Sequence, residues 1–286
     1  MMLARVFVAG AGLMGHGIAQ VLASSGRSVL LYEPDLARAA AGRERIAGSL
    51  VRAVDKGLLG AGVASDTLAR IATTDDVASV SQADLVVEAV FEDLVVKTSL
   101  WAELDARASG ACIFASNTSS ISIDRLAAAV AEPRRVRFIG LHFFSPVPVM
   151  PLIELIPGAA TDDRTVAAMR ELATALGKQV IVAADRPGFI VNRILMPQLA
   201  EAMRAFEEGV ATAEDIDTGA RIGLNHPMGP LELVDFIGLD VCLGIMRVLH
   251  EGLGKEQFRP PAVLLELVAA GRLGQKSGQG FHRYPR

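Results

Sequence analysis

The sequence predicts an α/β fold, in which a doubly wound and mainly parallel sheet is followed by a smaller all-helical domain. Three observations support this prediction. Short apolar runs alternate with helical patterns through the first two-thirds of the chain, a glycine-rich turn follows the first run, and only helical spacing recurs after Asp185. Alternation of strands and helices is typical of a parallel sheet with helices on its faces.

The expected strands are short runs rich in Val, Ile, Leu and Phe, as in strands buried on both faces. They lie at Ala4–Gly10, Ser28–Glu33, Leu85–Ala89, Cys112–Ser116, Arg137–His142, Leu152–Ile156 and Gln179–Ala183. The helices between them are expected at Leu13–Ser25, Leu36–Lys56, Asp93–Ala108, Ile123–Val130 and Thr165–Gly177. Gly26 ends the first helix well, because glycine tolerates the left-handed conformation of a helix C-terminus.

The pattern changes after Asp185, where apolar residues recur at helical spacing and no strand is indicated. Helices are expected at Glu214–Ile222, Leu231–Phe236, Leu239–Glu251 and Ala262–Ala270. The predicted boundary lies near Ala184–Pro187. It separates a dinucleotide-binding domain of residues 1–184 from an all-helical domain of residues 185–286.

The composition is that of a globular protein with a surplus of apolar residues. Apolar residues make up 51% of the 286 positions, and the mean hydropathy is +0.37. The longest apolar candidate, 138–160, contains His142, Glu154 and four prolines, whereas a membrane-spanning helix needs about 20 apolar residues in succession. We therefore expect a subunit interface, and no membrane association, to account for the surplus.

Cysteine usage and charge narrow the class of protein further. Two cysteines far apart in sequence, Cys112 and Cys242, indicate reduced thiols and a cytoplasmic enzyme. The first residues show no charged lead or cleavage site, so no signal peptide is expected. A formal charge of −4 gives no reason to expect nucleic-acid binding.

The glycine-rich turn Gly10-Ala11-Gly12-Leu13-Met14-Gly15 matches G-x-G-x-x-G between a predicted strand and a predicted helix. Gly10 permits the tight turn, Gly12 lets the backbone approach a pyrophosphate, and Gly15 allows close helix–strand packing. The helix N-terminus at Leu13 and Met14 offers N–H groups to the phosphates. Glu33 lies 21 residues beyond Gly12, where an acidic side chain accepts ribose hydroxyls and repels an extra 2′-phosphate. The turn predicts a Rossmann-type site for NAD rather than NADP.

A stripe of polar residues follows on the next predicted helix. Its members, Arg45, Ser49, Arg52 and Lys56, share one helical face. Such a stripe would suit the phosphates of a nucleotide-like handle on the substrate. The alternative is a solvated basic face balanced by neighbouring acids, which the spacing alone slightly favours.

Polar side chains gather at strand ends in the second half of the first domain. Ser119 follows one strand, His142 ends the next, and Glu154 stands among apolar neighbours. Each has a structural alternative: a turn or helix cap (with Ser120 or Ser122 as the cap), a hydrogen-bonded core histidine, and an exposed edge-strand acid. Beside a nicotinamide, however, oxidation of an alcohol needs a proton acceptor, and a histidine oriented by a carboxylate suits that role. The histidines and cysteines show no paired metal spacing, so no metal site is predicted.

Across essentially its full length, the chain resembles the 3-hydroxyacyl-CoA dehydrogenase family, in its single-function 3-hydroxybutyryl-CoA dehydrogenase form. The matching motifs are Gly-Ala-Gly-Leu-Met-Gly, Glu88-Ala89 with Glu92 and Lys97, Ser-Asn-Thr-Ser-Ser, Gly-Leu-His-Phe-Phe, 187–193 (Pro-Gly-Phe-Ile-Val-Asn-Arg), Pro227-Met228-Gly229-Pro230 and 276–281 (Lys-Ser-Gly-Gln-Gly-Phe). Several such motifs in this order are highly specific.

The resemblance implies roles for the matching residues. His142 would be the general base of a reversible oxidation of an L-3-hydroxyacyl-CoA to the 3-oxoacyl-CoA, with Glu154 orienting it. Ser119 and Asn192 would hold the substrate oxygen, and Ser49 and Lys56 would contact CoA. The dinucleotide would be lined by Glu92, Lys97, Ser119 and Lys276. The family is typically a homodimer built through its helical domain.

Two departures from the family pattern concern the cofactor. Ser145 stands where asparagine usually follows His-Phe-Phe near the nicotinamide, and Glu33 replaces the more usual aspartate. Both substitutions keep a polar group. Two other functions remain open, namely a dehydrogenase of a free hydroxy acid or sugar acid, and a dinucleotide-binding protein without turnover. Acyl chain length, direction and pathway are not determined by the sequence.

Overall fold

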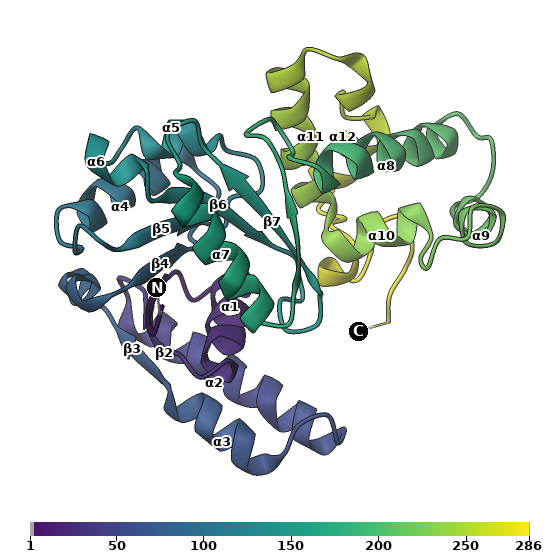
Figure 1. Ribbon diagram of the computed structural model, residues 1–286. Coiled ribbons are helices and arrows are strands. Elements are labelled where there is room, and N and C mark those ends of the chain that lie inside the picture. Colours follow the sequence, from purple (N-terminus) through teal and green to yellow (C-terminus); the bar gives the residue numbers. More distant parts are fainter. Residues whose placement is uncertain (1–2, 286) are drawn as a thin grey trace. The chain divides into compact units, whose positions relative to one another are not determined.

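The structure, a computed structural model, describes residues 3–285 (Figure 1). The chain forms two compact units, and the boundary between them falls between Arg186 and Pro187. The first is an α/β unit with one sheet, and the second is helical. The predicted fold class is therefore confirmed.

The sheet of the first unit has eight strands in the order β3-β2-β1-β4-β5-β6-β7-β8. All pairs from β3 to β6 are parallel, β7 runs antiparallel to β6, and β8 is parallel to β7. Their bounds are β1 Arg5–Ala9, β2 Ser28–Tyr32, β3 Ile71–Thr74, β4 Leu85–Glu88, β5 Ile113–Ser116, β6 Phe138–Phe143, β7 Leu152–Pro157 and β8 Gln179–Val182. The strand order reverses between β1 and β4, which is where open α/β sheets bind ligands.

Helices cover both faces of this sheet. They are α1 Leu13–Ser24, α2 Leu36–Asp55, α3 Ala61–Ala69, α4 Leu94–Asp105, α5 Ile123–Ala127, α6 Glu132–Arg135 and α7 Asp163–Ala175, with a 3-10 turn at Val77–Gln82. Apolar residues of α1, α2 and α7 share one core with the strands. On the other face, the Trp101 ring of α4 packs 4.9 Å from that of Phe114 and 4.8 Å from that of Phe138.

Two helices begin or end at the residues that the sequence indicates. Gly26 has φ +91°, and the amide of Arg27 returns to the carbonyl of Leu22, so glycine ends α1 in a Schellman-type turn. The Ser122 hydroxyl accepts the amide of Arg125 and caps α5. Neither α3 nor β3 was among the predicted elements.

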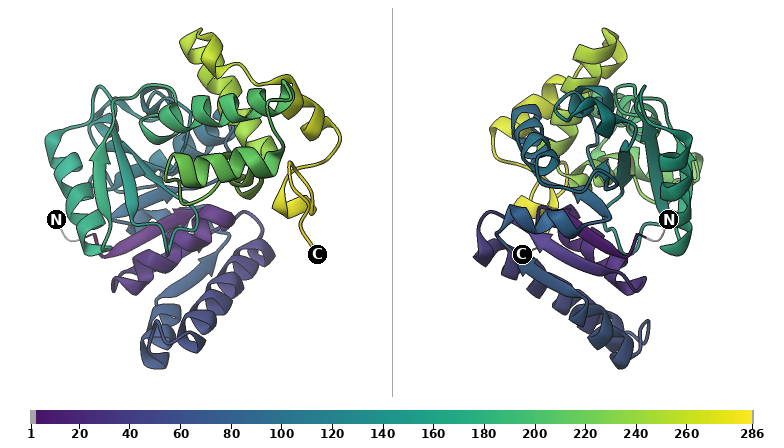
Figure 2. Two further views of the ribbon diagram at one scale, coloured as in Figure 1. Left: turned by 90° about the vertical axis from the view of Figure 1, so that its right-hand side faces the viewer. Right: turned by 60° about the vertical axis from the view of Figure 1, so that its left-hand side comes forward.

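The helical pair α2–α3 fills the long return between β2 and β3 and extends beyond the strands (Figure 2). The strand that follows, β3, lies at one edge of the sheet. The Arg43 guanidinium of α2 reaches this strand, and its Nε donates to the carbonyl oxygen of Ile71 at 3.0 Å.

The second unit contains α8 Val191–Glu207, α9 Ala213–Gly223, α10 Pro230–Ile237, α11 Leu239–Leu253 and α12 Ala262–Ala269, with 3-10 turns at Glu256–Phe258 and Gln275–Ser277. A separate apolar core, which includes Met196, Leu231 and Met246, joins α8, α10 and α11. Among residues 3–285, no helix is both long and apolar enough to cross a membrane.

Candidate active site

The glycine-rich turn joins β1 to α1 beside the end of β4. Gly10 has φ +103°, and a Cβ there would lie 2.6 Å from the carbonyl oxygen of Ala89. A Cβ on Gly15 would lie 1.7 Å from the carbonyl oxygen of Gly10. Both positions therefore exclude any side chain, as the tight turn and the close helix–strand packing predict.

Gly12 is different, because apart from its own neighbours along the chain no atom lies within 4 Å of the position its Cβ would take. Gly12 is the N-cap of α1 and no side chain caps the first turn, where Leu13 and Met14 begin the helix. Open space over uncapped helical N–H groups suits an anionic ligand. The residues present thus fit a dinucleotide pyrophosphate.

A cavity of about 420 Å³ adjoins this turn. It is lined by Ala11, Gly12, Leu13, His16, Glu33, Arg38, Ala41 and Arg45. Glu33 follows β2 and is 8% exposed, and its Oε1 accepts the amide of Ala11 at 2.8 Å. The predicted ribose-binding acid is therefore in the same cavity as the glycine-rich turn.

A buried ionic cluster follows β4. The Lys97 ammonium lies 2.5 Å from Oε1 of Glu88 and 3.2 Å from Oε2 of Glu92. Lys97 and Glu88 are buried almost completely, and the second oxygen of Glu88 accepts the Ser116 hydroxyl at 2.6 Å. Glu88 therefore links β4 to β5 through Ser116, while the Lys97 ammonium pairs with both Glu88 and Glu92.

Glu92 in turn organises the start of the Ser-Asn-Thr-Ser-Ser segment. Its Oε1 accepts the amides of Ser119 and Ser120 at 2.8 and 3.1 Å and the Thr118 hydroxyl at 2.5 Å. Burial would raise the pKa of Glu92, but the Lys97 ammonium and these hydrogen bonds outweigh it and lower the pKa below its usual value. The structure thus brings together the predicted residues Glu92, Lys97 and Ser119.

His142 and Glu154 face each other on β6 and β7, in direct register. Nδ1 of His142 lies 2.7 Å from Oε2 of Glu154. Glu154 is fully buried and β7 is an interior strand, so it is not an exposed edge-strand acid. The Asn117 side chain accepts the amide of Phe143 at 2.8 Å and ties the end of β5 to β6.

The connection from β6 to β7 carries Ser145, which is exposed. The Lys178 ammonium steadies this connection by donating to the carbonyl oxygens of Val147 and Met150 at 2.8 and 2.7 Å. Burial lowers the pKa of Lys178.

The basic stripe lies along α2, with Ser49 half-buried and Arg52 and Lys56 exposed. Arg45 differs from the rest of the stripe, because it lines the cavity beside Glu33 and donates to the carbonyl oxygen of Ala11 at 3.3 Å. Arg38 and His16 also line this cavity and were missed by the sequence reasoning. The position of Arg38 in the sequence could have revealed it, since it precedes Arg45 by two helical turns and so lies on the same face of α2.

Two predicted residues belong to the helical unit. Asn192 is buried in the first turn of α8. Lys276 lies in the turn Gln275–Ser277, where its ammonium is 2.5 Å from Oδ1 of Asp240. The backbone after this turn is held by Asp235, whose carboxylate is buried and accepts the amides of Phe281 and His282 at 2.9 and 2.8 Å.

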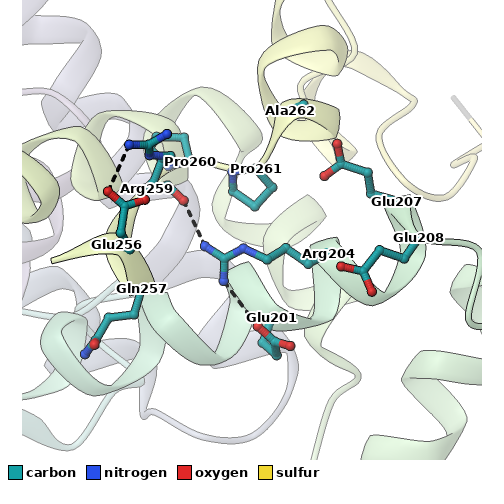
Figure 3. Close-up of a pocket in the computed structure, with 10 residues that line it drawn as sticks. All are labelled: Glu201, Arg204, Glu207, Glu208, Glu256, Gln257, Arg259, Pro260, Pro261 and Ala262. Atoms are coloured by element: carbon teal, nitrogen blue, oxygen red, sulfur yellow. Dashed lines mark hydrogen bonds and ion pairs between the residues drawn. The ribbon is translucent and has the colours of Figure 1, made fainter.

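The helical unit also has a cavity of about 700 Å³ between α8 and the segment 256–262 (Figure 3). Arg204 spans it, with one nitrogen 3.2 Å from Glu201 and another donating to the carbonyl oxygen of Arg259 (Figure 3). Neither Asn192 nor Lys276 lines this cavity. Within residues 3–285, no three His, Cys, Asp or Glu side chains gather as metal ligands would.

Comparison with known families assigns both units. The family described as 3-hydroxyacyl-CoA dehydrogenase, NAD binding domain, matches residues 5–186. The corresponding C-terminal domain matches residues 188–284. A 3-hydroxybutyryl-CoA dehydrogenase of Bradyrhizobium diazoefficiens is 48% identical over 98% of this chain and 95% of its own length. The mitochondrial hydroxyacyl-coenzyme A dehydrogenase of Homo sapiens is 44% identical over 98% and 91%.

Solved structures agree with this assignment. The crystal structure of Mycobacterium tuberculosis FadB2 has 46% sequence identity and a TM-score of 0.97, with both chains fully covered. That of the (S)-3-hydroxybutyryl-CoA dehydrogenase PaaH1 from Ralstonia eutropha has 42% identity and a TM-score of 0.94, again with full coverage of both. Because the two family models together match nearly the whole chain and relatives above 40% identity align along its length, the chain belongs to the 3-hydroxyacyl-CoA dehydrogenase family of NAD-binding oxidoreductases.

Proposed function

We propose that this protein oxidises the 3-hydroxyl group of a short L-3-hydroxyacyl-CoA, such as 3-hydroxybutyryl-CoA, to the 3-oxoacyl-CoA, reversibly and with NAD. The observation that carries the proposal is the hydrogen bond between His142 and the buried Glu154. NAD, when bound, accepts the hydride from C3 of the substrate. Relatives named as 3-hydroxybutyryl-CoA dehydrogenases, at 44–48% identity, support the short acyl chain.

In this mechanism His142 takes the proton of the substrate hydroxyl. A carboxylate only accepts hydrogen bonds, so Nδ1 of His142 carries the hydrogen that points to Glu154 and Nε2 has the basic lone pair. The positive charge that develops on the ring is stabilised by Glu154, which is fully buried and therefore weakly screened. Ser119 and Asn192 hold the substrate oxygen.

The remaining site residues bind either NAD or the CoA part of the substrate. Gly10, Gly12, Leu13, Met14, Gly15 and Glu33 bind the adenosine and pyrophosphate of NAD, and Glu92, Lys97, Ser119, Ser145 and Lys276 bind or position its nicotinamide half. Because the Lys97 ammonium is buried between two carboxylates, it positions the nicotinamide half indirectly, through Glu92 and the backbone of Ser119 that Glu92 holds. Ser49 on α2 and Lys56, which directly follows this helix, contact CoA.

The protein acts in the cytoplasm as a homodimer, with residues 1–184 binding NAD and CoA and residues 185–286 forming the subunit interface. The helical unit supports this arrangement through large apolar side chains exposed to solvent, namely Ile194, Val210, Ile222, Leu224 and Phe236. Large apolar side chains that lie together at a protein surface are typical of interaction surfaces. Sedimentation equilibrium measures the mass directly, and a monomer at micromolar concentration would contradict a stable dimer.

The decisive experiment follows NADH absorbance with acetoacetyl-CoA as the oxidant. His142→Ala is expected to lower kcat by about 10²–10⁴, whereas the control His250→Ala changes a histidine of the helical unit and keeps the rate. Near-normal turnover by His142→Ala contradicts the mechanism. Acetoacetate as the preferred oxidant indicates a free hydroxy-acid dehydrogenase, and NADH binding without oxidation indicates a non-catalytic protein.

A further inference from the structure

The cavity beside Glu33 contains two arginines for which the proposed NAD chemistry has no use. Arg38 and Arg45 both line it, and they lie seven residues apart on α2, which places them on one face of the helix. An acid that excludes a 2′-phosphate and an arginine that accepts one are usually alternatives at this position of a dinucleotide site. Here one cavity holds both kinds of residue.

Close packing of α2 against the glycine-rich turn brings the arginines there. A Cβ on Gly42 would lie 2.7 Å from the Cβ of Ala11 and 2.9 Å from its carbonyl oxygen, so only glycine allows this approach. The face of α2 that carries Arg38, Ala41 and Arg45 is thereby turned towards the cavity.

Ala11 links the acid to one of the bases. Its amide donates to Oε1 of Glu33 at 2.8 Å, and its carbonyl oxygen accepts Nη1 of Arg45 at 3.3 Å. The carboxylate and the guanidinium are therefore held on either side of a single peptide residue. A ligand group that reaches one of them is also close to the other.

The charges decide which ribose this cavity accepts. A 2′-hydroxyl donates to the Glu33 carboxylate, whereas a 2′-phosphate would stand against a negative charge that is 8% exposed and weakly screened. Guanidinium groups bind phosphate through paired charge-assisted hydrogen bonds. We propose that Arg38 and Arg45 form a latent 2′-phosphate site, and that the Glu33 carboxylate alone keeps NADP out of it.

This inference rests on the proposed function, because it requires the cavity to take the adenosine half of the cofactor. Glu33→Gln tests it most directly, since the amide oxygen can still accept the amide of Ala11 while the charge is removed. The probes are adenosine 2′,5′-bisphosphate and 5′-AMP, which differ only by the 2′-phosphate. Their dissociation constants are measured by isothermal titration calorimetry, without turnover.

Relative to the wild type, Glu33→Gln is expected to bind the bisphosphate at least about tenfold more tightly, or about 1.4 kcal/mol, with little gain for 5′-AMP. The triple variant Glu33→Gln/Arg38→Gln/Arg45→Gln loses this gain. The matched control Glu33→Gln/Arg70→Gln keeps it, because Arg70 precedes β3 at the amino end of the strand, whereas Glu33 follows the carboxyl end of β2. NADPH should also become a better reductant of acetoacetyl-CoA in the variants that gain the bisphosphate.

Unchanged bisphosphate affinity in a folded Glu33→Gln protein overturns the inference, as does a gain that survives removal of both arginines. If Glu33→Gln does not fold, Arg38→Gln/Arg45→Gln in the wild-type background still tests the arginines, because it should weaken bisphosphate binding more than 5′-AMP binding. Failure of the wild-type protein to bind NADH is a different result, which contradicts the proposed function itself.

Discussion

His142 and Glu154 are direct cross-strand neighbours, and Nδ1 of the imidazole lies 2.7 Å from a carboxylate oxygen. The chain between them in sequence includes the turn that reverses it into β7. Because side chains alternate along a strand, a slip of one residue in this pairing would turn Glu154 to the other face of the sheet. The register of β6 with β7 therefore aligns the proposed catalytic pair.

Replacing Glu154 with glutamine tests the charge of this pair, because glutamine has nearly the same shape as glutamate but no charge. Glu154→Gln removes the charge and offers an N–H group to Nδ1, which favours the wrong tautomer of His142, so kcat should fall about 10²-fold or more. The double variant with His142→Ala should be scarcely slower than His142→Ala alone, since the two residues act as a unit. Steady-state kinetics with acetoacetyl-CoA measure both, and fully additive losses would argue against a coupled pair.

The two glycines of the turn should respond differently to alanine. Gly12 has φ −68° and open space at its Cβ position, so Gly12→Ala should unfold like the wild type but bind NADH at least about tenfold more weakly, or about 1.4 kcal/mol. Gly15→Ala, in contrast, should also lower the stability of the fold, because its Cβ would overlap the carbonyl oxygen of Gly10. Urea unfolding and NADH fluorescence titration distinguish the two, and a stable Gly15→Ala protein would contradict the packing argument.

The buried pair of Lys97 and Glu88 should be costly to break from one side. Lys97→Met leaves the Glu88 carboxylate buried without its counter-ion, so the free energy of unfolding should fall by about 3–5 kcal/mol. Changing Glu88 to Gln in the same chain should recover part of the loss. Arg107→Met is the matched control, because its pair with Glu103 is exposed and should contribute less than about 1 kcal/mol. If Lys97→Met and Arg107→Met lowered the free energy of unfolding by the same amount, this account would be contradicted.

Both thiols should be inert in the folded protein. Burial raises the pKa of Cys112 and of Cys242 to about 12, so near pH 8 only about 10⁻⁴ of each thiol is the reactive thiolate. Both side chains are also inaccessible to reagents. Ellman's reagent should label them only at the rate of unfolding, and labelling that outpaces unfolding would show that one thiol is exposed by a local opening.

Much of the fold could be predicted from the sequence, because short runs of Val, Ile, Leu and Phe indicate the buried strands and helical periodicity indicates the helices. The strand β3 (Ile-Ala-Thr-Thr) has one large apolar residue and the helix α3 has two, Val63 and Leu68, which is too few to give such a signal. The glycine-rich turn was interpretable because each glycine has a separate steric reason. The pairing of Glu154 with His142 could be expected only from the family resemblance, since strand register depends on tertiary pairing that the sequence of β7 alone does not reveal.

Other site features depend on distances that no linear pattern contains. Helical spacing groups Arg45 with the basic stripe, for which phosphate binding and a solvated face both stay open, yet Gly42 brings its end of α2 against Ala11 and into the cavity of Glu33. Asp235 was not singled out, because a single acid in a predicted helix usually faces solvent. Its burial follows from the return of the backbone at Phe281 and His282.

The guanidinium of Arg43 affects the tendency of the protein to aggregate at high concentration. An open strand edge is a template on which a strand of another molecule can pair and start an aggregate. β3 is such an edge, and the Ile71 carbonyl that Arg43 occupies is one of the acceptors a foreign strand would need. Loss of this arginine should therefore reduce solubility at high concentration before it affects turnover.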